Sequence, residues 1–215
     1  HTFCRSCITE QCAICKVNFT KGTRNIPIEE ICSLIGNPCP YKSNGCNFMM
    51  AQNLLPGHVA KCPYRKMECP LKKLPDMQCE WNGSVKELRG HIFQAHRSKA
   101  SERQYVMSTS LNNDVQFIIY EKEIFMCYKF CKDQIWYAFI QEAGITLKSF
   151  KCVFGLRSLL NDVDSVNMTL PIFNFDQSFE RILDNGMGLM LDTAVVRNYI
   201  KKNEMNMMVG VEEIR

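Results

Sequence analysis

The second half of this 215-residue sequence contains no histidine. All four histidines lie in the first hundred residues, at His1, His58, His91 and His96. A catalytic site in the second half would therefore lack the commonest general base. The cysteines found there, Cys127, Cys131 and Cys152, have no histidine to activate them, and the acidic residues stand mostly in turn sequences. We expect this half of the chain to bind a partner rather than to catalyse a reaction.

Long apolar runs and concentrated positive charge are also missing. No run approaches the roughly 18 consecutive apolar residues that a membrane-spanning helix needs, so we expect no membrane partner. The net charge is only +4, with both signs interspersed along the chain. Proteins that bind nucleic acid usually gather basic residues on one face, whereas the stretch "SVKELRG" sets Lys86 and Arg89 against Glu87. We therefore expect no nucleic-acid partner.

Cysteine, in contrast, is abundant, with 13 residues in the chain. Ten of them precede residue 80, in the part of the sequence that also holds the histidines. A disulfide framework gives histidine no reason to accompany cysteine, whereas zinc takes thiolate and imidazole into one tetrahedral shell. Thiols that bind metal must stay reduced, so we expect the protein in the cytosol or the nucleus.

Two groups of four potential ligands share one spacing pattern. The first is C-x6-C-x11-H-x3-C and the second is C-x9-C-x11-H-x4-H, and the common gap of eleven residues indicates one module used twice. Four protein ligands fill a zinc shell and leave no open position for a reacting water, so we predict two structural zinc ions. The predicted ligands are Cys39, Cys46, His58 and Cys62 in the first group, and Cys69, Cys79, His91 and His96 in the second.

Local patterns predict two helices in this region. Ser84 followed by Glu87 forms a capping box at the start of a helix that presents the second pair of histidines. Residues 17–36 carry apolar side chains at mostly helical offsets, which predicts a connecting helix. Cys32 lies on this helix and fits neither group of ligands, so we expect a buried thiol that packs against its neighbours.

From Tyr105 onward the pattern changes to the alternation of β-strands. "DVQFIIYEKE" places Val115, Phe117 and Ile119 on one face, and "SFKCVFGLRS" has the same period. Further short strands follow at the spacing of a sandwich, with helical stretches only at "DQSFERILDNG" and "AVVRNYIKKN". We predict an antiparallel β domain of about 110 residues, a size that can bury one core.

The opening "HTFCRSCITEQCAIC" resembles the latter five ligands of a RING finger. The resemblance implies that Cys4 and Cys7 bind one zinc ion, while His1, Cys12 and Cys15 bind the other. It also implies that this sequence starts inside the RING, with three ligands upstream, and that a chain of this extent ligates ubiquitin weakly or not at all.

This order of modules is similar to that of the seven in absentia family of RING-type ubiquitin ligases. Four stretches carry the likeness: "RNIPIEEI", "PCPYKSNGC", "CEWNGSVKELRGHIFQAH" and "GLMLDTAVV". The resemblance implies a multi-domain protein in which small zinc-stabilised modules precede an all-β, TRAF-like antiparallel sandwich. The expected boundaries are half a RING at 1–16, a linker helix at 17–36, tandem zinc fingers at 37–97 and the TRAF-like domain at 104–215.

The same resemblance implies a function. The RING would recruit a ubiquitin-conjugating enzyme, and the β domain would bind degron-bearing substrates, form a homodimer and direct the substrates to proteasomal degradation. Phe117 and Ile119 match positions of the family's substrate groove, although the family has tryptophan where this chain has Phe117. The alternative is a zinc-dependent adaptor with the same fold and no ligase activity.

Overall fold

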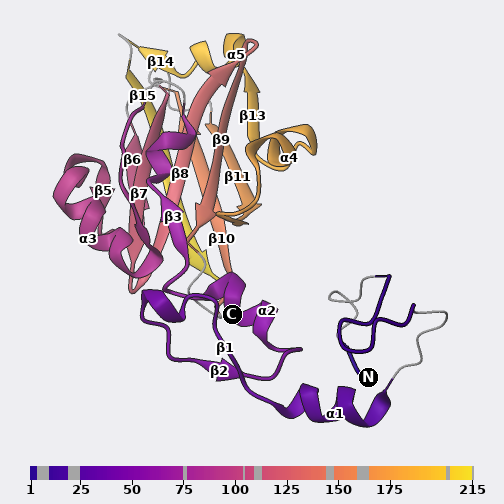
Figure 1. Cartoon of the computed structure of the whole chain (residues 1–215). Coiled ribbons are helices and arrows are strands. Elements are labelled where there is room, and N and C mark those ends of the chain that lie inside the picture. Colours follow the sequence, from indigo (N-terminus) through magenta and orange to yellow (C-terminus); the bar gives the residue numbers. More distant parts are fainter. Residues whose placement is uncertain are drawn as a thin grey trace.

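The computed structural model of the chain describes nine stretches of residues. They are 1–3, 10–18, 25–74, 77–103, 105–108, 113–143, 148–158, 165–201 and 204–214. Cys4 and Cys7 lie outside them, so the structure does not test their expected role. In Figure 1 the chain passes from an N-terminal segment and helix, through the region of the two predicted fingers, into the tall β sheets.

The helix expected within residues 17–36 is present as α1, Ile26–Leu34. Asn25 caps it, because its side chain accepts a hydrogen bond of 3.3 Å from the backbone amide three residues later. All nine residues of α1 are exposed, and Leu34 reaches 84% exposure. Cys32 is exposed as well, so the expectation of a buried thiol is wrong. A helix face is buried only where another element covers it, and Figure 1 shows α1 away from the β sheets.

The first finger is built from short elements around a very small core. These elements are β1 (Asn37–Pro38), η2 (Lys42–Asn44), β2 (Met49–Met50) and α2 (Leu55–Lys61), with β1 and β2 paired antiparallel. The buried cluster consists of Cys39, Cys46 and Cys62, with Tyr41 and Tyr64 packed against it. So few apolar groups cannot offset the conformational entropy of folding, and a bound metal ion is the usual remedy.

The second finger has a larger apolar surface. Its elements are β3 (Lys66–Glu68), η3 (Pro70–Lys73), β4 (Asn82–Ser84) and α3 (Val85–Ala95), with β3 and β4 antiparallel. The predicted capping box of α3 is confirmed, since Glu87 accepts a hydrogen bond of 2.8 Å from the Ser84 amide. The apolar side of α3 is buried. The two apolar residues of η3, Pro70 and Leu71, are buried as well.

Two sheets form the β domain that the sequence predicts. The first has the order β12-β9-β8-β7-β5, with β13 also paired to β9. Its strands are β5 (Ala100–Ser101), β7 (Asp114–Tyr120), β8 (Glu123–Lys132), β9 (Ile135–Glu142), β12 (Phe173–Asn174) and β13 (Leu189–Asp192). Its long neighbours β7, β8 and β9 are antiparallel, whereas β5 pairs parallel to β7 and β12 parallel to β9.

The second sheet has β10 and β15 at its centre, with β11 beside β10 and β6 and β14 beside β15, all antiparallel. Its strands are β6 (Tyr105–Ser108), β10 (Phe150–Arg157), β11 (Ser165–Pro171), β14 (Ile200–Lys201) and β15 (Glu204–Glu213). The turn η4 (Arg97–Lys99) precedes the sheets, and the predicted helical stretch "DQSFERILDNG" contains α4 (Phe179–Asp184). Of the predicted helical stretch "AVVRNYIKKN", only the first four residues are helical, at the end of α5 (Thr193–Arg197), and the stretch then continues into strand β14. The prediction of a mainly antiparallel sandwich is therefore confirmed.

The chain packs in three layers. Between the two sheets, one face of β7, β8 and β9 meets the inward side chains of β10 and β15. On the opposite face of the first sheet, α4 and the second finger pack against residues such as Phe117 and Tyr128. The seven residues 124–130 of β8 are all buried as a result. A strand loses the usual exposed face when both sides of its sheet are covered, so the second finger is one of the layers of the β domain.

Candidate metal centres

The structure brings the first predicted group of ligands together. The ligand atoms of Cys39, Cys46, His58 and Cys62 all lie within 4.8 Å of one another. The sulfurs of Cys39 and Cys62 are 3.8 Å apart, and the sulfur of Cys46 is 3.4 Å from Nε2 of His58. A tetrahedral zinc ion with Zn–S of about 2.3 Å and Zn–N of about 2.0–2.1 Å separates two sulfurs by about 3.8 Å and a sulfur from a nitrogen by about 3.5 Å. The group therefore has the dimensions of a zinc shell.

Tight turns position these four ligands. Gly45 has a φ of 105°, which favours glycine, and this turn directs Cys46 back to donate its amide to the Tyr41 carbonyl. A Cβ on Gly45 would also lie only 3.1 Å from the ring of Tyr64. His58 comes from α2, and Cys62 caps the end of that helix. The Asn44-Gly45 turn signal in the sequence thus places the second ligand.

The surroundings of the first centre shift the pKa values of two of its thiols in opposite directions. Burial raises the pKa of Cys62 to about 12. Burial also opposes the ionisation of Cys46, but the Phe48 amide and the two neighbouring thiols favour its thiolate and lower its pKa. Because zinc binds thiolates, a bound ion would supply the positive charge that keeps all three sulfurs ionised and would release their protons.

The second predicted group is also assembled. The ligand atoms of Cys69, Cys79, His91 and His96 lie within 4.8 Å of one another. The two sulfur–nitrogen contacts, Cys69 to His96 and Cys79 to His91, are 3.5 and 3.6 Å. Burial lowers the pKa of both histidines, with the charge of His96 adding to the effect on His91. A neutral imidazole is the form that coordinates metal.

Aromatic rings pack around the second centre. Trp81 stacks on the His91 ring at a centroid distance of 4.4 Å and an angle of 4°. The His96 ring faces Phe117 of β7 at 6.3 Å and 25°. The spacing of cysteines and histidines does not identify Trp81 as part of the site, although its position two residues after Cys79 is a usable signal. These rings fix the orientation of the histidines and join the centre to the first sheet.

The two residues expected to line a substrate groove, Phe117 and Ile119, are buried. Phe117 is 0% exposed and Ile119 is 2% exposed, and both belong to the core between the first sheet and the second finger. The edge of β7 at Phe117 is paired with Ala100 of β5. The structure therefore does not place these two side chains in an open groove. The physical reason is that the second finger covers the sheet face to which their alternation assigns them.

A third cluster lies at the start of the chain. The ligand atoms of His1, Cys12 and Cys15 are within 4.8 Å of one another, and Nδ1 of His1 is 3.4 Å from the Cys12 sulfur. The Cys15 amide donates to the same sulfur at 3.4 Å. This amide, with other neighbouring donors, lowers the pKa of Cys12. The resemblance to a RING assigned these same three residues to one ion.

Part of this chain is similar to known proteins. Residues 30–107 match the family model described as "Sina, zinc finger". The chain is 31% identical over 100 residues both to "E3 ubiquitin-protein ligase siah2" of Xenopus laevis and to "E3 ubiquitin-protein ligase SIAH2" of Homo sapiens. It is 30% identical over 100 residues to "E3 ubiquitin-protein ligase sina" of Schistosoma mansoni. Residues 30–107 are therefore similar to the zinc-finger region of seven in absentia proteins.

The likeness to these seven in absentia proteins covers 46% of this chain and 31%, 30% and 26% of the three relatives, so the chain spans about a third or less of their length. The matched residues 30–107 contain both groups of four ligands. Zinc is therefore the metal of these two centres. Among the described residues, no helix is long and apolar enough to cross a membrane.

Proposed function

We propose that this protein is a RING-type ubiquitin ligase of the seven in absentia family. The observation that carries the proposal is the His1, Cys12 and Cys15 cluster standing ahead of a Sina zinc finger. Three relatives of that finger are named E3 ubiquitin-protein ligases, which supports the same activity here. In this proposal the opening module docks a ubiquitin-conjugating enzyme in the cytosol or the nucleus.

The ligase would act by proximity and orientation. A RING holds the ubiquitin thioester of the conjugating enzyme in a reactive pose, and the β domain holds the substrate whose lysine attacks, so no side-chain catalyst is needed. We further propose that the β domain takes degron-bearing substrates, that two copies associate to gain avidity, and that the modified substrates go to the proteasome. The buried core that the second finger shares with the first sheet supports this division of labour, because it packs the fingers directly against the proposed substrate-binding domain.

Autoubiquitination tests the ligase activity. The protein, in its full natural length, is incubated with activating enzyme, a purified ubiquitin-conjugating enzyme, ubiquitin and ATP. We expect chains from the wild type and at least a tenfold loss for Cys12→Ser, which removes a buried ligand of the third cluster, at the start of the chain. Cys131→Ser is the matched control, because Cys131 is exposed and outside all three clusters.

Equal chain formation by Cys12→Ser and the wild type would contradict the proposed role of the opening module. The absence of chains from the wild type with a panel of conjugating enzymes would favour the adaptor. In that case the protein would still bind its partners through the β domain, and a pull-down with the Cys12→Ser variant would recover them as well as the wild type does.

A further inference from the structure

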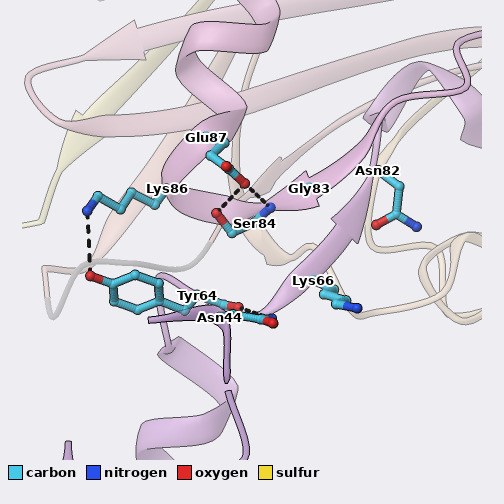
Figure 2. Close-up of a pocket in the computed structure, with 8 residues that line it drawn as sticks. All are labelled: Asn44, Tyr64, Lys66, Asn82, Gly83, Ser84, Lys86 and Glu87. Carbon is cyan, nitrogen blue, oxygen red and sulfur yellow. Dashed lines mark hydrogen bonds between the residues drawn. The ribbon is translucent and has the colours of Figure 1, made fainter. Parts of the chain in front are cut away.

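A polar pocket of about 590 Å³ lies where the two fingers meet, outside the three metal centres. Figure 2 shows Tyr64, from the segment between the fingers, and Lys66 and Lys86, from the second finger, among the residues that line it. Neither the structural zinc ions nor the proposed ligase mechanism uses these side chains. The pocket therefore calls for an explanation of its own.

The pocket is lined by two lysines, Lys66 and Lys86, whose ammonium groups are available to an anionic ligand. Nζ of Lys86 is 3.5 Å from the Tyr64 hydroxyl oxygen and 5.2 Å from the centre of the Tyr64 ring. That oxygen accepts from Lys86, so the phenolic hydrogen is available to donate to a ligand. The side chains of Lys66 and Asn82 are exposed and make no hydrogen bond or ion pair with other residues in the described part of the chain. The pocket thus has two ammonium groups, one phenolic hydroxyl and one carboxamide as donors, and Figure 2 shows Lys66 and Lys86 apart from each other.

The acidic residue of the pocket, Glu87, already accepts hydrogen bonds within the chain. Glu87 accepts hydrogen bonds from the amide and the hydroxyl of Ser84, at 2.8 and 2.7 Å. The first amides of α3 are also satisfied, because Val85 and Lys86 donate to backbone carbonyls of the segment between the fingers. The helix end therefore offers no anion site. The fixed charge of Glu87 disfavours a doubly charged phosphate group more than a singly charged carboxylate.

We propose that this pocket binds an extended acidic segment of a partner protein. Carboxylate side chains of the segment contact Lys66 and Lys86, with the Tyr64 hydroxyl as an additional donor. The exposed carboxamide of Asn82 is placed to pair with a peptide group, whereas that of Asn44 donates to the Tyr64 carbonyl at 3.1 Å. The fingers then recognise a partner in addition to supporting the β domain. This proposal is independent of the ligase activity, since its test contains no ubiquitin.

Binding of a short peptide tests the proposal. The probe is fluorescein-labelled Ala-Glu-Ala-Glu-Ala, with Ala-Gln-Ala-Gln-Ala as the uncharged counterpart, and the readout is fluorescence anisotropy with the zinc-loaded protein at low salt. We expect the Lys66→Glu, Lys86→Glu double variant to bind the acidic peptide at least about tenfold more weakly, because two attractive contacts become repulsive. Tyr64→Phe keeps the ring and should weaken binding about 2–10-fold.

The control is the double variant Lys42→Glu, Lys132→Glu. It makes the same change in net charge at two exposed lysines that do not line the pocket, and should alter affinity less than about twofold. Neither pocket substitution threatens the fold, since both lysines are exposed and an acidic residue in the first turn of α3 complements the helix dipole. Zinc content and circular dichroism verify this for each variant.

The location of the peptide is read from Trp81. Gly83 lines the pocket, and a Cβ placed on it would lie 2.5 Å from the Trp81 ring, so the indole lies directly behind the pocket wall. We expect the acidic peptide to shift the indole N–H resonance of Trp81 and the amides of Lys66 and Ser84 in NMR spectra. Equal affinity of the two double variants, or resonance shifts confined to other regions, would overturn the proposal. Equally tight binding of a single-stranded RNA pentamer would also overturn it in favour of unspecific attraction of anions.

Discussion

Gly83 lines the pocket on one side and lies next to the Trp81 ring of the second metal centre on the other. An added methyl group would lie 2.5 and 2.9 Å from two ring carbons of Trp81, which itself stacks on His91. A shift of the Trp81 ring away from this methyl group would disturb its stacking on His91, which is a predicted zinc ligand. Gly90 differs, because it lies on the exposed side of α3 with nothing within 4 Å of the methyl position.

We therefore expect opposite effects from two alanine substitutions in the same finger. Gly83→Ala should destabilise the protein by about 1–3 kcal/mol through overpacking and should weaken zinc binding at the second centre. Gly90→Ala should stabilise it by about 1 kcal/mol, since alanine is the better helix former. Chemical denaturation and competition with a zinc chelator measure both effects. A loss of stability in Gly90→Ala, or no loss in Gly83→Ala, would contradict the close contact inferred between Gly83 and the Trp81 ring.

At the scale of elements, Lys73 joins η3 of the second finger to the β domain. Its ammonium group donates to Oε1 of Gln141 at 2.9 Å and to the Phe175 carbonyl at 2.6 Å, and lies 3.5 Å from the centre of the Phe175 ring. Burial lowers the pKa of Lys73 to about 8, with nearby Asp176 opposing the effect and Arg65 adding to it. Arg65 itself reaches the same loops, where it pairs with Asp176 at 3.3 Å and donates to the Ala143 carbonyl.

This contact predicts a specific dependence of stability on pH. Between pH of about 8 and the ordinary lysine value of 10.5, the unfolded chain holds a proton on Lys73 that the folded chain releases. Stability contributed by this group therefore rises with pH across that window, by on the order of 1–2 kcal/mol after solvent screening. The difference in unfolding free energy between the wild type and Lys73→Met should grow from about pH 7.5 to about pH 9.5. A constant difference would show that Lys73 keeps its proton.

At the scale of the whole molecule, the two groups of four zinc ligands have different neighbours. The second finger shares one core with the first sheet, where Leu71, Leu88 and Ile92 are at most 3% exposed. Each such side chain contributes about 1.5–3 kcal/mol on burial. The first finger has its own small cluster of cysteines, and apolar residues such as Phe48 remain 59% exposed. Loss of the two ions should therefore have unequal consequences.

We expect Cys69→Ser to destabilise the β domain by at least about 3 kcal/mol, because the sheet loses the layer that covers its outer face. Cys39→Ser should cost the β domain less than about 1 kcal/mol, although each variant loses one zinc ion. Amide hydrogen exchange in β8 and β9 distinguishes the two outcomes, and zinc analysis confirms the loss of metal. Equal protection of these strands in both variants would show that the second finger is a separate domain.

Much of the local structure follows from short-range patterns in the sequence. The matched spacings identified which four residues form each quartet, the Ser84 and Glu87 pair located the start of α3, and alternation in residues 114–120 and 150–157 located two strands. These signals work because a capping bond or a tetrahedral shell involves residues that chain spacing already brings near each other, or whose types are restrictive.

What the sequence by itself determined is therefore the ligand groups, the type of most elements and the resemblance of the finger region to the seven in absentia family. Only the tertiary structure decided which surfaces stay exposed. Alternation shows that Phe117 and Ile119 share one face of a strand, but not that the second finger covers that face. Helical periodicity in α1 likewise shows an apolar side, but not that Cys32 lies in solvent. Burial depends on which distant segment packs against a face, and that information is absent from the residues of the face itself.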